Sequence, residues 1–192
     1  MKIIEQLKKT HSKKLALILR HSDRYEIKKS EFGNDVLLNA QGIEKAKIFG
    51  KELRNYKINK IYTSPIERCV QTAENIVIGY KKQIEIIKTE ALGDPGIHVS
   101  DANLLGQYYF EYGFWKIFEN FKNNIPVDGL YFKKQVKEKF DAFLLEKMQK
   151  DGLTLFITHD WQVAFYAYAK QINEFTKNNW INYLEGLIIN FD

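Results

Sequence analysis

Several features are scarce in this 192-residue chain. Cys69 is its one cysteine, so no disulfide can close within the chain, and we expect a reducing, cytoplasmic compartment. No apolar run approaches the roughly 20 residues of a membrane span, and the short run before Arg20 lacks the flanks of a secretory signal. No run of basic residues exceeds two, so the formal net charge of +5 is not concentrated in a nucleic-acid-binding stretch. We therefore expect neither a membrane nor a nucleic acid as partner.

Apolar residues are plentiful. Hydrophobic residues make up 45% of the chain and aromatic residues 14%, a composition typical of a globular protein and not of a disordered one. At this length the chain can bury a sizeable core without disulfides or metals. We predict one domain over residues 1–192, with an irregular, aromatic cap insertion over about residues 94–130.

Short apolar runs alternate with helical patterns along the chain. The helical patterns span residues 39–56, 64–80, 131–152 and 161–170, with Asn39 and Ser64 as expected N-caps and Glu67 closing a capping box with Ser64. Residues 1–13 are expected to form a short helix or a loose arm. The expected strands are residues 14–20, 57–63, 83–88, 153–158 and 186–191. This alternation predicts an α/β fold, a three-layer α/β/α sandwich with a mostly parallel central sheet.

Arginine is rare and unevenly placed. Of the 29 lysines and arginines only four are arginines, namely Arg20, Arg24, Arg54 and Arg68. Where a chain uses lysine by default, an arginine indicates a need for its planar fork, which binds phosphate or carboxylate through two hydrogen bonds. Three of the four lie close to the ends of predicted strands, which suggests a site for an anion.

Two histidines follow predicted strands at the same edge of the sheet. His21 follows the strand 14–20, and His159 follows the strand 153–158. Ligands of parallel sheets bind at the carboxyl ends of the strands, and a helix N-terminus there adds backbone donors for an anion. A neutral histidine can attack phosphorus, arginines can stabilise the phosphoryl oxygens, and a carboxyl group can protonate the leaving alkoxide. The pattern favours phosphoryl transfer.

Three motifs resemble those of a known family. RHSDR (20–24), TSPIERCVQTAE (63–74) and THD (158–160) are similar in order and placement to motifs of the histidine phosphatase superfamily, which has the phosphoglycerate-mutase-like fold. The similarity covers about residues 14–80 and 150–192. One departure is Ser22, where glycine is commonest in the family, although the position mainly needs a small residue.

The resemblance implies a metal-independent phosphatase that needs no cofactor and forms a phosphohistidine on its nucleophile, His21. It implies phosphate binding by Arg20, Arg24, Arg68 and His159. The substrate is expected to be a small phosphorylated molecule or a phosphopeptide, and the resemblance leaves the oligomeric state open.

The proton donor is left open between two carboxylates. One branch of the family uses a carboxylate after the third strand, which points to Glu90 in TEALGDPG (89–96), where GDPG is expected to be a turn. The other branch uses the aspartate directly after the second histidine, here Asp160. We favour Asp160 because the chain has the His-Asp pair.

Each site residue also has a purely structural interpretation. Arg20 and Arg24 would be surface ion-pair partners of Asp23, while Arg68 would pair along its helix. His159 would be a core histidine, Asp160 an N-cap and Glu90 a solvated charge. Each of these interpretations is reasonable alone, but together they are less convincing, because all of them must hold at the same edge of the sheet. The other expected non-site residues are Cys69 as a core side chain and His11 and His98 as surface residues.

Other functions remain open on the sequence alone. A phosphomutase of the same fold differs only in the acceptor of the phosphoryl group. A non-catalytic phosphate-binding protein is a further alternative, as is a metal-dependent phosphohydrolase with His21, His159 and Asp160 as ligands. The aromatic stretch 108–121 is expected to pack a lid and line the pocket, where it would set substrate preference.

Overall fold

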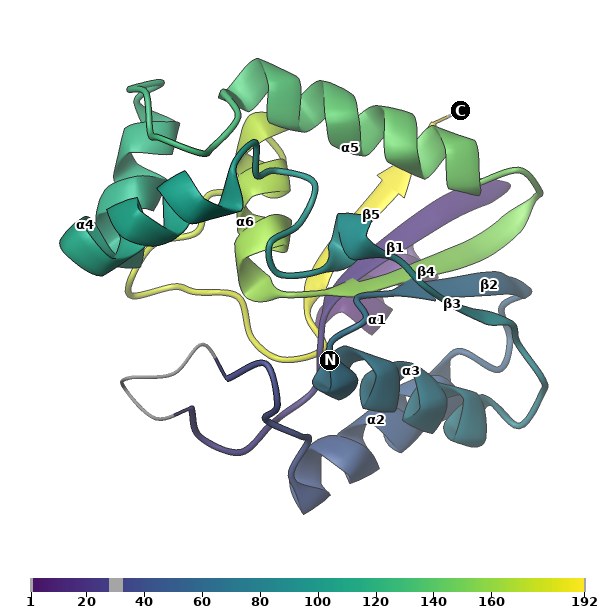
Figure 1. Ribbon diagram of the computed structural model, residues 1–192. Helices are drawn as coiled ribbons and strands as arrows, with labels where there is room; N and C mark the ends of the chain where they lie inside the picture. The colour runs from purple at the N-terminus through teal and green to yellow at the C-terminus, as the bar shows by residue number, and fades with distance from the viewer. Residues whose placement is uncertain (1, 28–32, 192) are drawn as a thin grey trace.

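One five-stranded sheet organises the part of the chain that the computed structural model describes, residues 2–27 and 33–191 (Figure 1). The strand order is β3-β2-β4-β1-β5. Four strands run parallel, and only β5 runs antiparallel, to β1. The strands are β1 (Lys14–Arg20), β2 (Ile58–Thr63), β3 (Ile86–Lys88), β4 (Gly152–Thr158) and β5 (Gly186–Asn190). The predicted mostly parallel α/β fold is confirmed.

Helices cover both faces of the sheet, which makes three layers (Figure 1). α1, α2 and α3 pack on one face, and α4, α5 and α6 on the other. The helices are α1 (Lys2–Lys8), α2 (Ala40–Glu52), α3 (Glu67–Tyr80), α4 (Ala102–Lys122), α5 (Lys133–Lys147) and α6 (Asp160–Ala169). No helix within the described ranges is long and apolar enough to cross a membrane.

The apolar run of β1 explains why both faces need covering. Leu15, Leu17 and Leu19 belong to the core under α1, α2 and α3, whereas Ala16 and Ile18 belong to the core under α4, α5 and α6. Successive side chains of a strand point to opposite faces, so a strand buried on both sides is apolar throughout. The unbroken run therefore marks a central strand, and β1 lies between β4 and β5.

Three details differ from the sequence-based predictions. Asn39 caps α2 by accepting from the Gly42 N–H, as expected, but α3 begins after Ile66, which makes no side-chain cap bond. Oγ of Ser64 accepts from the Ile66 N–H at 3.2 Å, ahead of the helix, and also contacts His159. α5 ends at Lys147 and not at Gly152, where a φ of 126° begins β4. The segment 94–130 is not irregular, since it contains α4, whose helical conformation is interrupted at Gly113 by a φ of 75°.

The sheet ladder continues past the strands into the site. The His21 N–H donates to the Thr158 carbonyl at 2.9 Å, and the Ser64 N–H donates to the Ile157 carbonyl at 2.9 Å. The residues that follow β1, β2 and β4 are therefore held in register with one another. The ends of these neighbouring parallel strands bring His21, Ser64 and His159 together.

Candidate active site

A cavity of about 570 Å³ opens at the carboxyl ends of β1 and β4. Its wall combines the polar residues singled out in the sequence with apolar residues of α4 and its preceding loop. The lining residues are Arg20, His21, Arg24, Ile27, Asn34, Arg68, Asp94, Pro95, His98, Val99, Ala102, Leu105, Gly106, Tyr109, His159, Asp160 and Trp161. All six site residues predicted from the motifs therefore meet at one cavity.

His21 is buried and held in one orientation. Its Nδ1 lies 2.8 Å from the carbonyl oxygen of Ser22, so Nδ1 carries the proton and donates. Its Nε2 accepts a hydrogen bond from Nε of Arg68 at 3.2 Å. Burial lowers the pKa of His21 well below its ordinary value, and nearby His159 and Arg68 lower it further. At neutral pH the imidazole is uncharged, with the lone pair of Nε2 directed at Arg68.

Arg68 joins the two histidines through its guanidinium. Besides the bond to His21, its Nη2 lies 3.2 Å from Nδ1 of His159, and its Nη1 donates to the Gly33 carbonyl at 2.7 Å. The arginine is 4% exposed. One planar fork therefore spans the floor of the cavity, a geometry that a lysine cannot supply.

His159 faces the same floor from the end of β4. Because Nδ1 accepts from Arg68, Nε2 carries the proton and donates to Oγ of Ser64 at 3.0 Å. Burial lowers the pKa of His159 to about 3, and the charge of Arg68 adds to the effect. The rings of His159 and His21 lie 5.6 Å apart. Ser64 thus orients the second histidine. The sequence did not indicate this role, because Ser64 is already explained there as an expected N-cap.

Arg20 and Asp160 form a partly buried ion pair at the cavity wall. Nη2 of Arg20 lies 3.0 Å from Oδ2 of Asp160, and Nη1 donates to the Ile181 carbonyl at 2.6 Å. Oδ2 of Asp160 also accepts from the Trp180 indole at 3.0 Å, and Oδ1 accepts from the Trp161 backbone. Both carboxylate oxygens of Asp160 therefore already accept hydrogen bonds.

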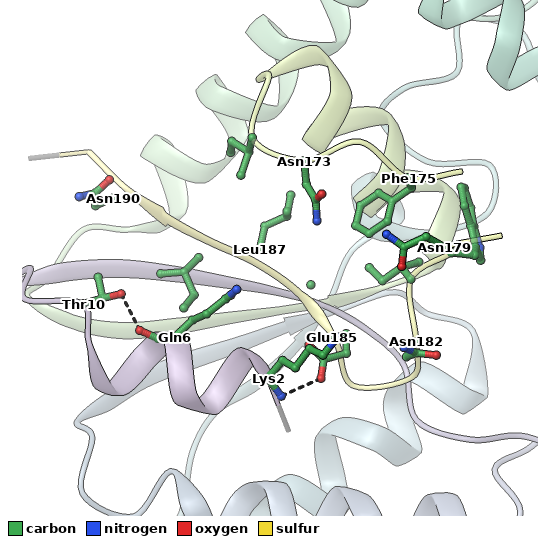
Figure 2. Close-up of a pocket in the computed structure, with 15 residues that line it drawn as sticks. Lys2, Gln6, Thr10, Asn173, Phe175, Asn179, Asn182, Glu185, Leu187 and Asn190 are labelled. Atoms are coloured by element: carbon green, nitrogen blue, oxygen red, sulfur yellow. Dashed lines mark hydrogen bonds between the residues drawn. The ribbon is translucent and has the colours of Figure 1, made fainter. Parts of the chain in front are cut away.

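Trp180 and Ile181, which hydrogen-bond to Asp160 and Arg20, also border a second cavity. This cavity, of about 410 Å³, lies between α1 and β5. Trp180 and Ile181 line it, together with the amide side chains of Gln6, Asn173 and Asn179 (Figure 2). Apolar side chains and the charged Lys2 and Glu185 also line it. Its described lining includes neither a histidine nor an arginine, so it offers no counterpart of the first site.

The surface ion-pair interpretation of the arginines does not hold. Asp23 pairs with Lys45 at 2.8 Å, and Arg20 pairs with Asp160. Arg24 lines the cavity and uses its Nη1 on the Tyr25 carbonyl at 2.8 Å. Arg20 and Arg24 therefore line the cavity from the end of β1 and the residues after it, and Arg68 lines it from α3, which follows β2.

Among the described lining residues, Asp94 and Asp160 are the carboxylates, and Glu90 is not part of that lining. Glu90 is exposed in the short 3-10 turn Glu90–Leu92, whereas Asp94, four residues later, is a lining residue. Asp94 is exposed, yet partial loss of hydration beside the surrounding protein raises the pKa of its carboxyl group. Arg68 lowers that pKa, and the Asp160 carboxylate raises it. Asp94 does not stand out in the sequence, because it lies in GDPG, and the turn propensity of that pattern is enough to explain an aspartate there.

His98 was expected at the surface, and that prediction is wrong. It is 2% exposed, its ring stacks on Phe165 at 5.2 Å, and it lines the cavity. Burial lowers the pKa of His98 to about 3, so it is neutral. The apolar neighbours Ile97 and Val99 are the signal that could have placed it inside.

Cys69 is fully buried on α3, as expected from its place on the apolar face of that helix. Burial raises the pKa of its thiol to about 12, so it is not a nucleophile. Over the described ranges, no group of three or more histidine, cysteine, aspartate or glutamate side chains is arranged to hold a metal ion.

The comparisons with known proteins agree with the motifs. Residues 3–96 match the model of the histidine phosphatase superfamily (branch 1), a range that includes His21, Arg68 and Asp94. No curated protein matches the sequence significantly.

Solved structures share the fold over most of the chain. A phosphoglycerate mutase from Bacillus anthracis str. Sterne superposes with a TM-score of 0.58 at 12% identity, covering 91% of this chain and 86% of its own. A putative alpha-ribazole-5'-P phosphatase from Escherichia coli gives 0.54 at 20% identity, covering 84% of each chain. The ecdysone phosphate phosphatase from Bombix mori gives 0.54 at 17% identity, covering 91% of this chain and 87% of its own. At these identities the likeness concerns the fold alone.

Proposed function

Since this chain is a member of the histidine phosphatase superfamily, we propose that it hydrolyses phosphate monoesters through a phosphohistidine formed on His21. The observation that supports this most is the state of His21. Its Nδ1 donates to the Ser22 carbonyl, and its uncharged Nε2 faces the guanidinium of Arg68. Such a histidine is a nucleophile aimed at the place where an anion would bind.

In the first step, Nε2 of His21 attacks phosphorus and the ester P–O bond breaks. The imidazole gains positive charge as the P–N bond forms, and the Ser22 carbonyl, which accepts from Nδ1, stabilises that charge. Water then attacks the phosphohistidine, the P–N bond breaks, and inorganic phosphate leaves with His21 neutral again.

The arginines of the cavity bind the phosphoryl oxygens in this proposal. Arg68 lies on the floor beside the neutral His159, and Arg20 and Arg24 lie at the wall. Arginine forks stabilise the charge that moves between oxygens during phosphoryl transfer. When phosphate binds, the Arg68 donors that now contact His21 and His159 can turn to its oxygens.

Asp94 is our proposed proton donor, in place of Asp160 and Glu90. Asp94 lines the cavity and its pKa is raised, so a larger fraction of it is protonated than of an ordinary aspartate. Asp160 accepts hydrogen bonds at both oxygens and pairs with Arg20, contacts that suit the ionised form. Asp94 would protonate the leaving alkoxide and then take a proton from the attacking water, while Asp160 positions Arg20.

The function is tested by turnover and by trapping the intermediate. The purified protein is incubated with a panel of phosphate monoesters in the presence of EDTA, and a labelled phosphoryl group is sought on the acid-quenched and alkali-quenched protein. We expect EDTA-resistant release of phosphate and a label that alkali preserves and acid removes, as for an N–P bond. Turnover that EDTA abolishes would contradict the proposal.

The donor assignment predicts a pattern across leaving groups. Asp94→Asn should lower kcat about 10²-fold or more for alkyl phosphates, whose alkoxides need a proton, and much less for p-nitrophenyl phosphate. Because the donor must be protonated, wild-type turnover of alkyl phosphates should fall as pH rises through the raised pKa of Asp94, and this limb should disappear in the variant. A leaving-group dependence found in Asp160→Asn and not in Asp94→Asn would transfer the role to Asp160.

A further inference from the structure

The cavity has two chemically distinct ends. The charged residues among its described lining lie at the ends of the strands and in the loop before α4, with Arg20, Arg24 and Arg68 as the cations. The remainder of that lining is largely apolar, including Val99, Leu105 and Trp161. A phosphate monoester that binds its phosphoryl group at the charged end must place its organic part against the apolar end.

One face of α4 forms much of the apolar end. Ala102, Leu105, Gly106 and Tyr109 line the cavity at spacings of three, four and seven residues, which is one stripe of a helix. None of these side chains is charged. α4 therefore presents a stripe of uncharged, mostly apolar residues to the cavity.

The facing ring, Trp161, is held in place by other aromatic rings. Its centroid lies 5.5 Å from that of Tyr109 and 4.5 Å from that of Phe114. Trp161 directly follows Asp160, so this flat apolar surface begins beside the proposed phosphate site. His98 adds a neutral ring, stacked on Phe165, to the same wall. Aromatic side chains arranged in this way favour stacking with a flat apolar group.

We propose that the substrates are phosphate monoesters of apolar alcohols that contain an aromatic or similarly flat ring, with Gly106 and Trp161 determining the fit. The reaction in this proposal rests on the function proposed above, whereas the ligand preference rests on the cavity wall alone. A sugar or glycerate phosphate would set several hydroxyl or carboxylate groups against this wall. Asn34, Tyr109 and Nδ1 of His98, which has no hydrogen-bond partner among the described residues, are polar, but most of the other side chains there are apolar, so most of those groups would lose hydration without gaining partners.

Gly106 leaves space that a side chain can fill. A Cβ placed there meets no atom within 4 Å, although the residue lines the cavity. The first side-chain atom of Gly106→Ala or Gly106→Leu therefore meets no neighbour, leucine reaches further from the helix, and both residues are better helix formers than glycine. Gln107 is the matched control, because it is exposed on the same helix and does not line the cavity.

The test compares two phosphonates by calorimetric titration, so that it does not depend on turnover. Benzylphosphonate carries an aromatic ring, and 2,3-dihydroxypropylphosphonate carries a polar group of smaller bulk. We expect wild-type protein to bind the benzyl compound about tenfold or more tightly than the dihydroxypropyl compound, as burial of the apolar ring favours it. Gly106→Leu should weaken benzyl binding by about tenfold or more and change dihydroxypropyl binding by less than about twofold. Gln107→Leu should leave both unchanged.

Several results would overturn the preference. They are equal affinities, tighter binding of the polar compound, the absence of binding by either, and benzyl binding that Gly106→Leu does not weaken. If the leucine variant does not fold, Gly106→Ala, which adds one methyl group, replaces it with a smaller loss of the same sign. If the protein prefers the benzyl compound but hydrolyses no ester, only the proposed hydrolase function is contradicted. If it hydrolyses esters but shows no such preference, only the proposed preference for apolar, ring-containing substrates is contradicted.

Discussion

His21→Ala should lower kcat for every phosphate monoester by roughly 10⁴-fold or more, because it removes the atom that forms the bond to phosphorus. The loss should be in kcat and should not depend on the leaving group. The labelled phosphoprotein should be absent from the variant at all reaction times. Binding of a phosphonate should persist, because Arg68 and His159 remain in place.

The control for this experiment is His11→Ala, since His11 is exposed and lies outside the cavity. It removes an imidazole of the same kind and should change neither kcat nor the label. Far-ultraviolet circular dichroism of both variants verifies that the fold is kept. A His21→Ala protein that retains a tenth of wild-type turnover would exclude His21 as the nucleophile and leave His159 to be tested.

The sheet and the motif residues could be predicted from the sequence because their signals are local. The run 14–20 is apolar at every interior position, as a strand covered on both faces must be, and β1 lies inside the sheet with helices on both sides. His21 and His159 directly follow such strands. Parallel neighbours then bring their ends together, which is a rule of topology and needs no knowledge of side-chain contacts.

Other parts of the site depend on contacts that no local pattern shows. Ser64 satisfies the rules for an N-cap, and its hydroxyl accepts from the Ile66 N–H, but it also contacts the His159 ring, 95 residues away, and α3 begins only after Ile66. Asp94 is part of a turn pattern, and only the fold of the loop places it in the cavity. Glu90 lies closer to the end of the predicted third strand, where one branch of the family has its proton donor, but it is in a 3-10 turn and does not line the cavity.

α4 shows the same limit for a whole element. It contains Gly106 and Gly113 and a dense mixture of aromatic and polar residues, so its sequence lacks a clear amphipathic period. Its stability comes from tertiary packing, such as Phe114 and Phe118 against the aromatic residues of α6. The stripe that lines the cavity becomes visible only once the helix is placed.

Substitutions of Arg68 distinguish the effect of its positive charge on turnover from the effect of its planar guanidinium. Arg68→Lys keeps the positive charge but cannot contact His21 and His159 together, so we expect kcat/KM to fall about 10²- to 10³-fold. Arg68→Met removes the charge as well and should cost more. Arg54→Lys is the control, because Arg54 binds the Gly79 carbonyl and does not line the cavity.

The pH dependence of the two Arg68 variants distinguishes a catalytic role from a structural one. Burial is the main reason that the pKa of His21 is lowered, and the neighbouring His159 and the positive charge of Arg68 lower it further. Removing the charge in Arg68→Met should therefore raise the pKa of His21, so that the histidine is protonated, and activity lost, at a higher pH than in the wild type. Arg68→Lys keeps the charge, and its acid limb should stay close to that of the wild type. If the acid limb moves equally in both variants, the shift reflects a rearranged site, and the guanidinium does not act on His21 as its contact suggests.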